Sequence, residues 1–127
     1  MKKVNISHVS NEHNYWLRSL NFYKTEISIL KGRLTEIAGK NTGSEVMKEV
    51  EHFENQFKIQ NDNIDRLSHD IHVNIDAISK QAQTQSAGYI DEILQTTHTA
   101  LGNRFEDEEK IIHDMIRTFR KFAEQWM

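Results

Sequence analysis

The chain contains no proline, no cysteine and only five glycines among its 127 residues. The lack of proline means that no residue must interrupt a helix. The lack of cysteine excludes disulfide scaffolds, thiolate metal sites and cysteine nucleophiles. With 28% charged and 37% hydrophobic residues, these absences predict an all-α protein with a single domain over residues 1–127.

Neither charge sign dominates, because 16 lysine and arginine residues stand against 19 aspartate and glutamate residues, for a formal net charge of −3. The basic residues are scattered among acidic ones, so no basic face is available for a phosphate backbone. Long apolar runs are also missing, including after the initial lysines, where a signal peptide would need one. We therefore expect a cytoplasmic protein without a nucleic-acid or membrane partner.

The first segment carries a heptad seam that predicts a helix over residues 8–38. Ser7 or Ser10 can cap its start, and Gly39 fits its end. The seam alternates steps of three and four residues, and His13 is its only member that is neither apolar nor aromatic. Its members are Ile6, Val9, His13, Trp16, Leu20, Tyr23, Ile27, Leu30, Leu34 and Ile37.

The second segment predicts a helix over residues 45–80, with Ser44 as its N-cap. Two polar residues, Gln60 and Asn74, occupy places in its stripe where an apolar residue is expected. The apolar members of that stripe are Val46, Val50, Phe53, Phe57, Ile64, Leu67, Ile71 and Ile78.

The third segment predicts a helix over residues 87–126, and its apolar rhythm is disturbed near Gly102. Since glycine costs about 1 kcal/mol in a helix interior, we expect a kink or a short break there. Short turns between long helices make them antiparallel neighbours. The fold class predicted is an elongated antiparallel up-down-up bundle of three helices; a four-helix bundle, broken at Gly102, would have much shorter pieces.

Antiparallel pairing about the two turns places Gln60 level with Glu108, which falls on the third stripe, and with Tyr23. We interpret these three residues as a polar layer that fixes the register of the helices, as buried polar residues do in coiled coils. Two alternatives stay open. Glu108 could be a functional carboxylate with a raised pKa, or the layer could be exposed.

Histidines suggest a second layer, because the same pairing puts His13 and His98 at one height. Imidazole is a good ligand for transition metals, with His72 or Glu12 as the third candidate in this layer. His69 shares the height but points away from the stripe. A single Glu-x-x-His spacing, Glu49 to His52, falls short of the two copies that di-iron bundles need. No metal site is favoured, and no cofactor is predicted.

Tyr15, Phe22 and Ile29 recur every seven residues on a side of the first helix distinct from its seam. Large apolar side chains in an exposed row are uncommon on a monomer. We expect this partner face to bind a second copy of the chain, giving a homo-oligomer such as a dimer. A heterologous partner helix and a wide helix without a partner are the alternatives.

The segments Glu51–Gln60, Ile64-Asp65 and His69-Asp70-Ile71, and the ending Phe119 to Met127, resemble a group of uncharacterised bacterial helical-bundle proteins. That resemblance implies a helical bundle and no activity. No serine or threonine is paired with a base, and no glycine-rich phosphate loop occurs. We therefore expect a non-enzymatic interaction or scaffold module, with a metal-binding bundle as the rival and a small-ligand site beside the polar layer as a third class.

Overall fold

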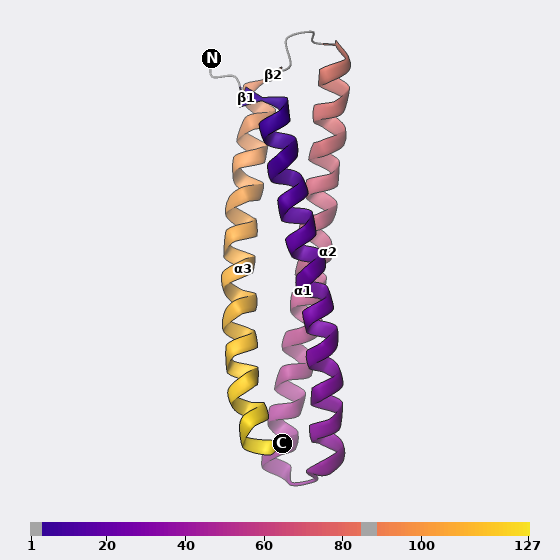
Figure 1. Ribbon diagram of the computed structural model, residues 1–127, viewed down its shortest axis with the longest axis vertical. Coiled ribbons are helices and arrows are strands. Elements are labelled where there is room, and N and C mark those ends of the chain that lie inside the picture. The colour runs from indigo at the N-terminus through magenta and orange to yellow at the C-terminus, as the bar shows by residue number, and fades with distance from the viewer. Residues whose placement is uncertain (1–3, 85–88) are drawn as a thin grey trace.

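Three long helices make up most of the computed structural model, which describes residues 4–84 and 89–127. They are α1 (Ile6–Lys40), α2 (Ser44–Thr84) and α3 (Glu92–Trp126). Figure 1 shows them side by side in an elongated bundle, with α2 antiparallel to the other two. The prediction of an all-α, up-down-up three-helix bundle is confirmed.

Side-chain caps set the starts of α1 and α3. The carboxamide of Asn5 accepts from the Ser7 N–H at 2.8 Å, and the carboxylate of Asp91 accepts from the Leu94 N–H at 2.9 Å. Asn5 therefore replaces Ser7 and Ser10, which the sequence proposed as caps, because α1 begins two residues before the predicted boundary. The predicted start of the third helix at Ala87 lies outside the described residues.

A three-residue turn, residues 41–43, joins α1 to α2. The predicted N-cap Ser44 is instead the first residue of α2, and the Gly43 carbonyl accepts from the Met47 N–H at 3.1 Å. α1 continues past Gly39 to Lys40, and the Asn41 N–H donates to the Ile37 carbonyl. So tight a turn packs α2 directly against α1.

A two-stranded antiparallel sheet, β1 (Val4–Asn5) and β2 (Tyr89–Ile90), pairs Val4 with Ile90 and Asn5 with Tyr89. It joins the chain just before α1 to the chain just before α3, so these two helices start at the same end of the bundle (Figure 1). The sequence does not predict this sheet, because two residues are too few to show the alternation of a strand.

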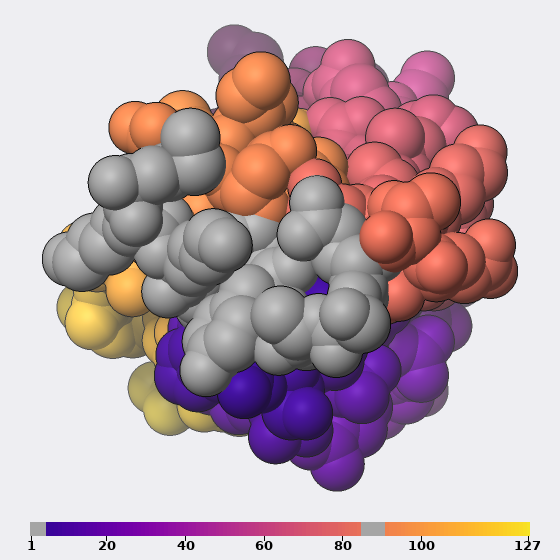
Figure 2. Space-filling model, turned by 90° about the horizontal axis from the view of Figure 1, so that it is seen from above, coloured from indigo at the N-terminus to yellow at the C-terminus, as the bar shows by residue number. Residues whose placement is uncertain are grey.

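The core follows the predicted stripes and extends along the bundle. Phe53, Phe57, Phe119 and Phe122 pack together from α2 and α3, with the rings of Phe53 and Phe122 5.0 Å apart between centroids. Figure 2 looks down the bundle and shows the three helices gathered around a common axis. Among the described helices, none combines the length and the low polarity needed to cross a lipid bilayer.

The helix α3 runs through Gly102 without a break, so the expected short break and the four-helix alternative are wrong. A β-carbon at Gly102 would lie 3.1 Å from the Trp16 ring. That indole stacks on His98, with centroids 4.8 Å apart, and on Phe105, at 6.1 Å. The glycine therefore makes room for an indole and does not end the helix.

Two glycine substitutions test this explanation. Gly32→Ala adds a β-carbon with nothing within 4 Å in the interior of α1, and it should raise the free energy of unfolding by about 0.5–1 kcal/mol. Gly102→Ala should lower it, because stacking on both sides holds the Trp16 indole in place. Urea unfolding of both variants measures the difference; equal gains would contradict the proposed role of Gly102.

Candidate functional site

Three buried polar side chains, one from each helix, meet toward the end of the bundle where α1 and α3 begin. They are His13 of α1, Asn74 of α2 and His98 of α3. Nε2 of His13 lies 3.1 Å from Nδ1 of His98 and 3.3 Å from the amide nitrogen of Asn74. Nε2 of His98 lies 3.0 Å from a Glu12 carboxylate oxygen. We call this set the histidine layer.

One proton arrangement satisfies all three contacts of the histidine layer. This arrangement makes His98 an imidazolium, which donates from Nδ1 to His13 Nε2 and from Nε2 to Glu12, while the Asn74 amide nitrogen shares the one lone pair of His13 Nε2. Glu12 also lies 3.0 Å from His8 on the surface. The layer is thus internally satisfied, and its one carboxylate is the member closest to solvent.

Burial, followed by the neighbouring His98, lowers the pKa of His13 to about 4 against the opposing effect of Glu12. The neutral imidazole is therefore the stable form in the folded protein. Because the unfolded chain binds this proton near pH 6.5 and the folded one only near 4, His13 contributes stability above pH 6.5 that is lost as the pH falls through this window.

Of the candidate metal ligands, the structure brings together His13, His98 and Glu12, and it places His72 on the exposed side of α2. Glu12 contacts the ring nitrogen of His98 that faces away from His13, so the three do not converge on one point. Asn74 takes the position on α2 that a third ligand would need. Within residues 4–84 and 89–127, no group of three or more histidine, aspartate or glutamate side chains could hold a metal.

The second polar layer joins Gln60 of α2 to Glu108 of α3, and both side chains are buried. With its amide turned so that the nitrogen faces the carboxylate, Gln60 donates to both oxygens of Glu108, at 2.6 and 3.2 Å. Burial raises the pKa of Glu108 to about 7. The sequence placed these two residues at one height, and the structure has them in contact.

Tyr23, which the sequence placed in this layer, turns toward the boundary between α1 and α3. Its hydroxyl donates to Glu109 at 2.6 Å and lies 3.0 Å from Nε2 of His113. Burial raises the pKa of Tyr23, and the bond to Glu109 raises it further. The correction has a geometric cause, because Glu109 follows Glu108 by about 100° around α3 and so faces the other neighbour.

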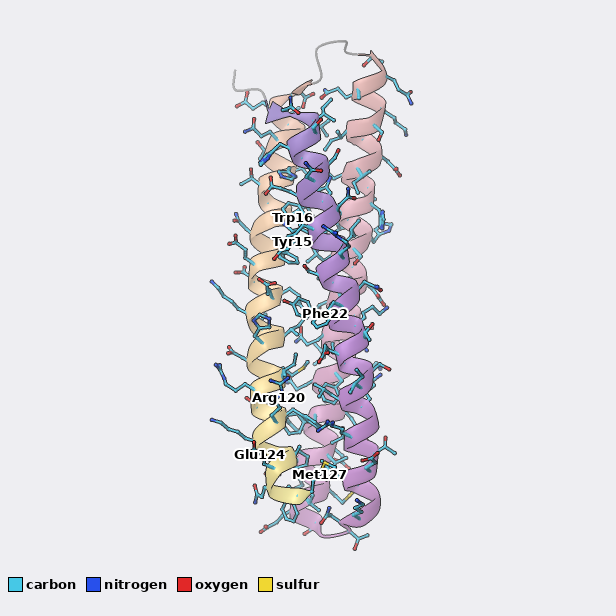
Figure 3. The ribbon with its side chains drawn as sticks, viewed as in Figure 1. Tyr15, Trp16, Phe22, Arg120, Glu124 and Met127 are labelled. Carbon is cyan, nitrogen blue, oxygen red and sulfur yellow. The ribbon has the colours of Figure 1, made fainter. Side chains whose placement is uncertain are left out.

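Tyr15, Phe22 and Ile29, the predicted partner face, are exposed by 52%, 58% and 52% of their surface. The Tyr15 ring packs its edge against Phe105 of α3, with centroids 5.8 Å apart. Figure 3 labels Tyr15 and Phe22 on α1, beside α3, with Tyr15 nearer the end where α1 starts. The row therefore follows the boundary between these two parallel helices.

Two hollows lie along this boundary. The first, of about 430 Å³, is lined by aromatic and acidic residues that include Tyr15, Trp16, Glu12, Glu106 and Glu109. We call it the acidic hollow. The second, of about 390 Å³, has Phe22 at its edge and is lined by Glu26, Arg117 and Arg120, among others. We call it the basic hollow. Opposite charges therefore gather at opposite ends of one apolar row.

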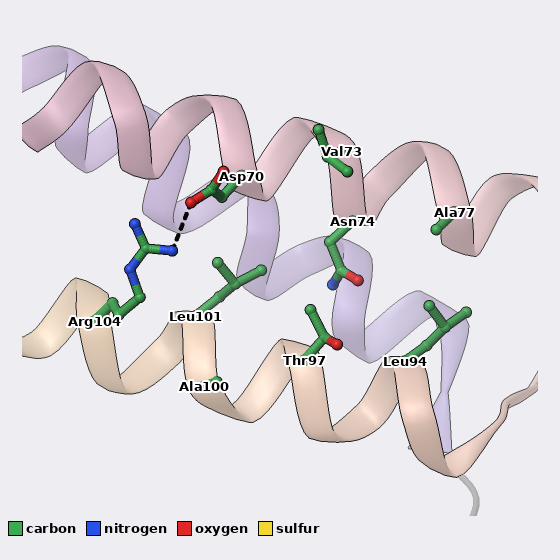
Figure 4. Close-up of a pocket in the computed structure, with 9 residues that line it drawn as sticks. All are labelled: Asp70, Val73, Asn74, Ala77, Leu94, Thr97, Ala100, Leu101 and Arg104. Atoms are coloured by element: carbon green, nitrogen blue, oxygen red, sulfur yellow. Dashed lines mark hydrogen bonds and ion pairs between the residues drawn. The ribbon is translucent and has the colours of Figure 1, made fainter.

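A third hollow, of about 460 Å³, opens between α2 and α3 (Figure 4). The ion pair between Asp70 and Arg104, 2.7 Å long, bridges the two helices at one end of it. Most of its lining is apolar or small, as at Val73 and Leu101. A fourth hollow reaches Glu108 but holds only about 200 Å³, less than the roughly 300 Å³ at which ligand pockets begin.

The variant Glu108→Gln tests the ionisation of the second layer. Glu108 keeps its proton up to about pH 7 in the folded protein and loses it near pH 4.5 when unfolded, so its contribution to stability is full below pH 4.5 and is lost as the pH rises through 7. The variant should match wild type at pH 4 and be more stable by about 1–3 kcal/mol at pH 8. Urea unfolding at both pH values measures this; exposed Glu106→Gln is the control, and a gain independent of pH would refute the assignment.

Metal content tests the histidine layer. Because the layer offers two converging imidazoles and no third ligand, protein purified without a histidine tag should carry less than about a tenth of an equivalent of zinc, copper, nickel or iron. Elemental analysis measures this. Stoichiometric metal that His98→Gln abolishes and His72→Gln leaves in place would make the metal-binding rival correct.

Comparison of the chain with protein-family models, with curated proteins and with solved structures gives no match. No activity can therefore be transferred to this chain by likeness, and the resemblance to bacterial helical-bundle proteins stays a prediction. What the chain does has to be argued from its own side chains.

Proposed function

We propose that the protein is a non-enzymatic helical interaction module that binds a second copy of itself through the boundary of α1 and α3. The observation that carries this proposal is the partner face, Tyr15, Phe22 and Ile29, each about half exposed. Tyr15 also lines the acidic hollow, and Phe22 lines the basic hollow. A spacing of seven residues keeps such side chains on one line along a helix, as in helices that pack on each other.

Burial of this row supplies the driving force for association. Each large apolar side chain contributes roughly 1.5–3 kcal/mol when it passes from full exposure to full burial. These three are half exposed and both copies bury them, so the summed gain is about 4–9 kcal/mol, against which the lost freedom of the two chains must be set. Further contacts from the hollows are therefore needed for a stable complex.

The buried polar layers support a structural role over a catalytic one. The Gln60–Glu108 pair lies inside the core beside a hollow too small for most ligands. His13 is 2% exposed, and its Nε2 contacts two other side chains of the protein. A catalytic group needs access to a substrate, whereas a group that fixes register needs neighbours.

The variant Phe22→Glu/Ile29→Glu tests self-association. It should shift wild-type dimer to monomer in sedimentation velocity without loss of helicity, because charge at two half-exposed positions opposes burial of the row but does not enter the core. The matched control is Ile59→Glu/Val73→Glu, which changes two residues of α2 with similar exposures of 45% and 54%.

Two results would count against this function. A wild-type protein that stays monomeric up to hundreds of micromolar would remove self-association, since interfaces of biological use bind more tightly than millimolar. A dimer that the α2 control disrupts and the α1 variant spares would move the interface to another face.

A further inference from the structure

We infer that two copies pair antiparallel across a two-fold axis that passes Phe22, so that the acidic hollow of each receives Arg117 and Arg120 of the other. This inference rests on the proposed function and adds the orientation and the contacts of the complex. It commits to a second copy as the occupant because the two hollows of one chain complement each other in charge.

Heights along the bundle bring the two hollows face to face. Residues of α1 and α3 that are 86 positions apart contact each other, as Glu12 does with His98 and Tyr23 with Glu109. Phe22 is therefore level with Glu108. Arg117 lies nine positions beyond Glu108 on α3. In a second copy reversed about Phe22, Arg117 therefore lies nine positions before Glu108 of the first copy, at the height of the acidic hollow.

Charge decides between antiparallel and parallel pairing. The acidic hollow is lined by Glu12, Glu106 and Glu109, and the basic hollow by Arg117, Arg120 and a single glutamate. In a parallel pair the acidic hollow of one copy would face the acidic hollow of the other, and repulsion between the like charges would oppose that arrangement. Antiparallel copies bring Arg117 of one copy to the height of Glu12 of the other, and a pairing of opposite charges of this kind gives an interface its register.

The chemistry of the acidic hollow suits a guanidinium group. Tyr15, Trp16 and Phe105 supply aromatic rings, and Glu12 supplies a carboxylate at the height that Arg117 reaches. Arginine stacks on aromatic faces and forms forked hydrogen bonds to carboxylates, and both interactions strengthen as water leaves. Figure 3 places Arg120 on α3 beyond Phe22, on the opposite side from Tyr15 and Trp16. Arg117 pairs with Asp114 on its own helix, so docking exchanges a surface partner for a more enclosed one.

The apolar row is self-complementary about the same axis. Phe22 lies midway between Tyr15 and Ile29, so reversal sets Phe22 against its own copy and Tyr15 against the Ile29 of the other chain. A two-fold interface requires this kind of self-matching, in which residue i meets j and j meets i. Two α1 and two α3 helices then enclose the row.

Single cysteines provide a direct test, because the chain has none of its own. Under mild oxidation Phe22→Cys should cross-link to itself, and Tyr15→Cys should cross-link with Ile29→Cys in a mixture. Tyr15→Cys alone should not, because antiparallel copies separate the two Tyr15 positions by roughly 21 Å, fourteen helical rises. Val73→Cys on α2 is the control for random collision.

Charge variants test the hollows separately from the apolar row. Arg117→Glu/Arg120→Glu should weaken the dimer at least about tenfold in sedimentation equilibrium. The control Lys58→Glu/Arg66→Glu makes the same change in net charge on exposed positions of α2.

The outcomes separate this inference from the proposed function. Strong Tyr15→Cys self-cross-linking, or a dimer indifferent to the arginine variants, would overturn the antiparallel arrangement and leave self-association standing. A wild-type protein that never dimerises would overturn both. The expected cross-links together with the tenfold loss would establish the arrangement.

Discussion

The contact among His13, Asn74 and His98 fixes the heights of all three helices at once, and the other cross-helix contacts depend on it. An apolar seam alone tolerates sliding by a turn, because one leucine or isoleucine fits another's place at small cost. Buried polar groups do not, since a shift would leave each without its hydrogen bond. Gln60 with Glu108 makes a second fixed point between α2 and α3, nearer the middle of the bundle. Only one alignment of the helices along the bundle satisfies both sets of contacts.

The two layers respond to pH in opposite directions. Below neutrality the unfolded chain takes a proton at His13 that the folded chain refuses, so this residue favours folding at higher pH. Glu108 holds its proton only in the folded chain over much of the same range, so it favours folding at lower pH. Their effects overlap between about pH 4.5 and 6.5 and partly cancel. The combined contribution of the two layers to the free energy of unfolding therefore changes little across mildly acidic pH.

Heptad spacing and turn composition were enough to predict the three helices and the buried stripes, because each signal is local to its segment. Heights were predicted well between α1 and α3, where His13 does meet His98, and poorly between α1 and α2, where His13 meets Asn74 and not His69. The reason is the lean of side chains toward the start of their own helix. Parallel helices lean alike and keep their offset, whereas antiparallel helices lean apart, which displaces the α1–α2 pairs although Gln60 of α2 still reaches Glu108 of α3.

Other features could not be read from the sequence because they depend on the packed structure. Gly102 looked like a helix breaker, and only the Trp16 indole beside it shows its role. Tyr23 was predicted to join the layer of Gln60 and Glu108 from its height alone, but its direction around α1 brings its hydroxyl to Glu109. Asn74 was recognised as a gap in the stripe without its partner. The exposed row on α1 could be predicted, but the charges beside it could not, because most of them are on α3 and are placed there by the packing of the two helices.

The small sheet of β1 and β2 has a consequence for how the chain folds. It closes a loop that contains all of α1 and α2, and closing so long a loop carries a large entropic penalty unless the intervening chain is already compact. The α1–α2 hairpin, joined by three residues, has no such penalty. We therefore expect the α1–α2 hairpin to fold first. The two strands should pair late, when α3 packs against the surface that the hairpin has already formed.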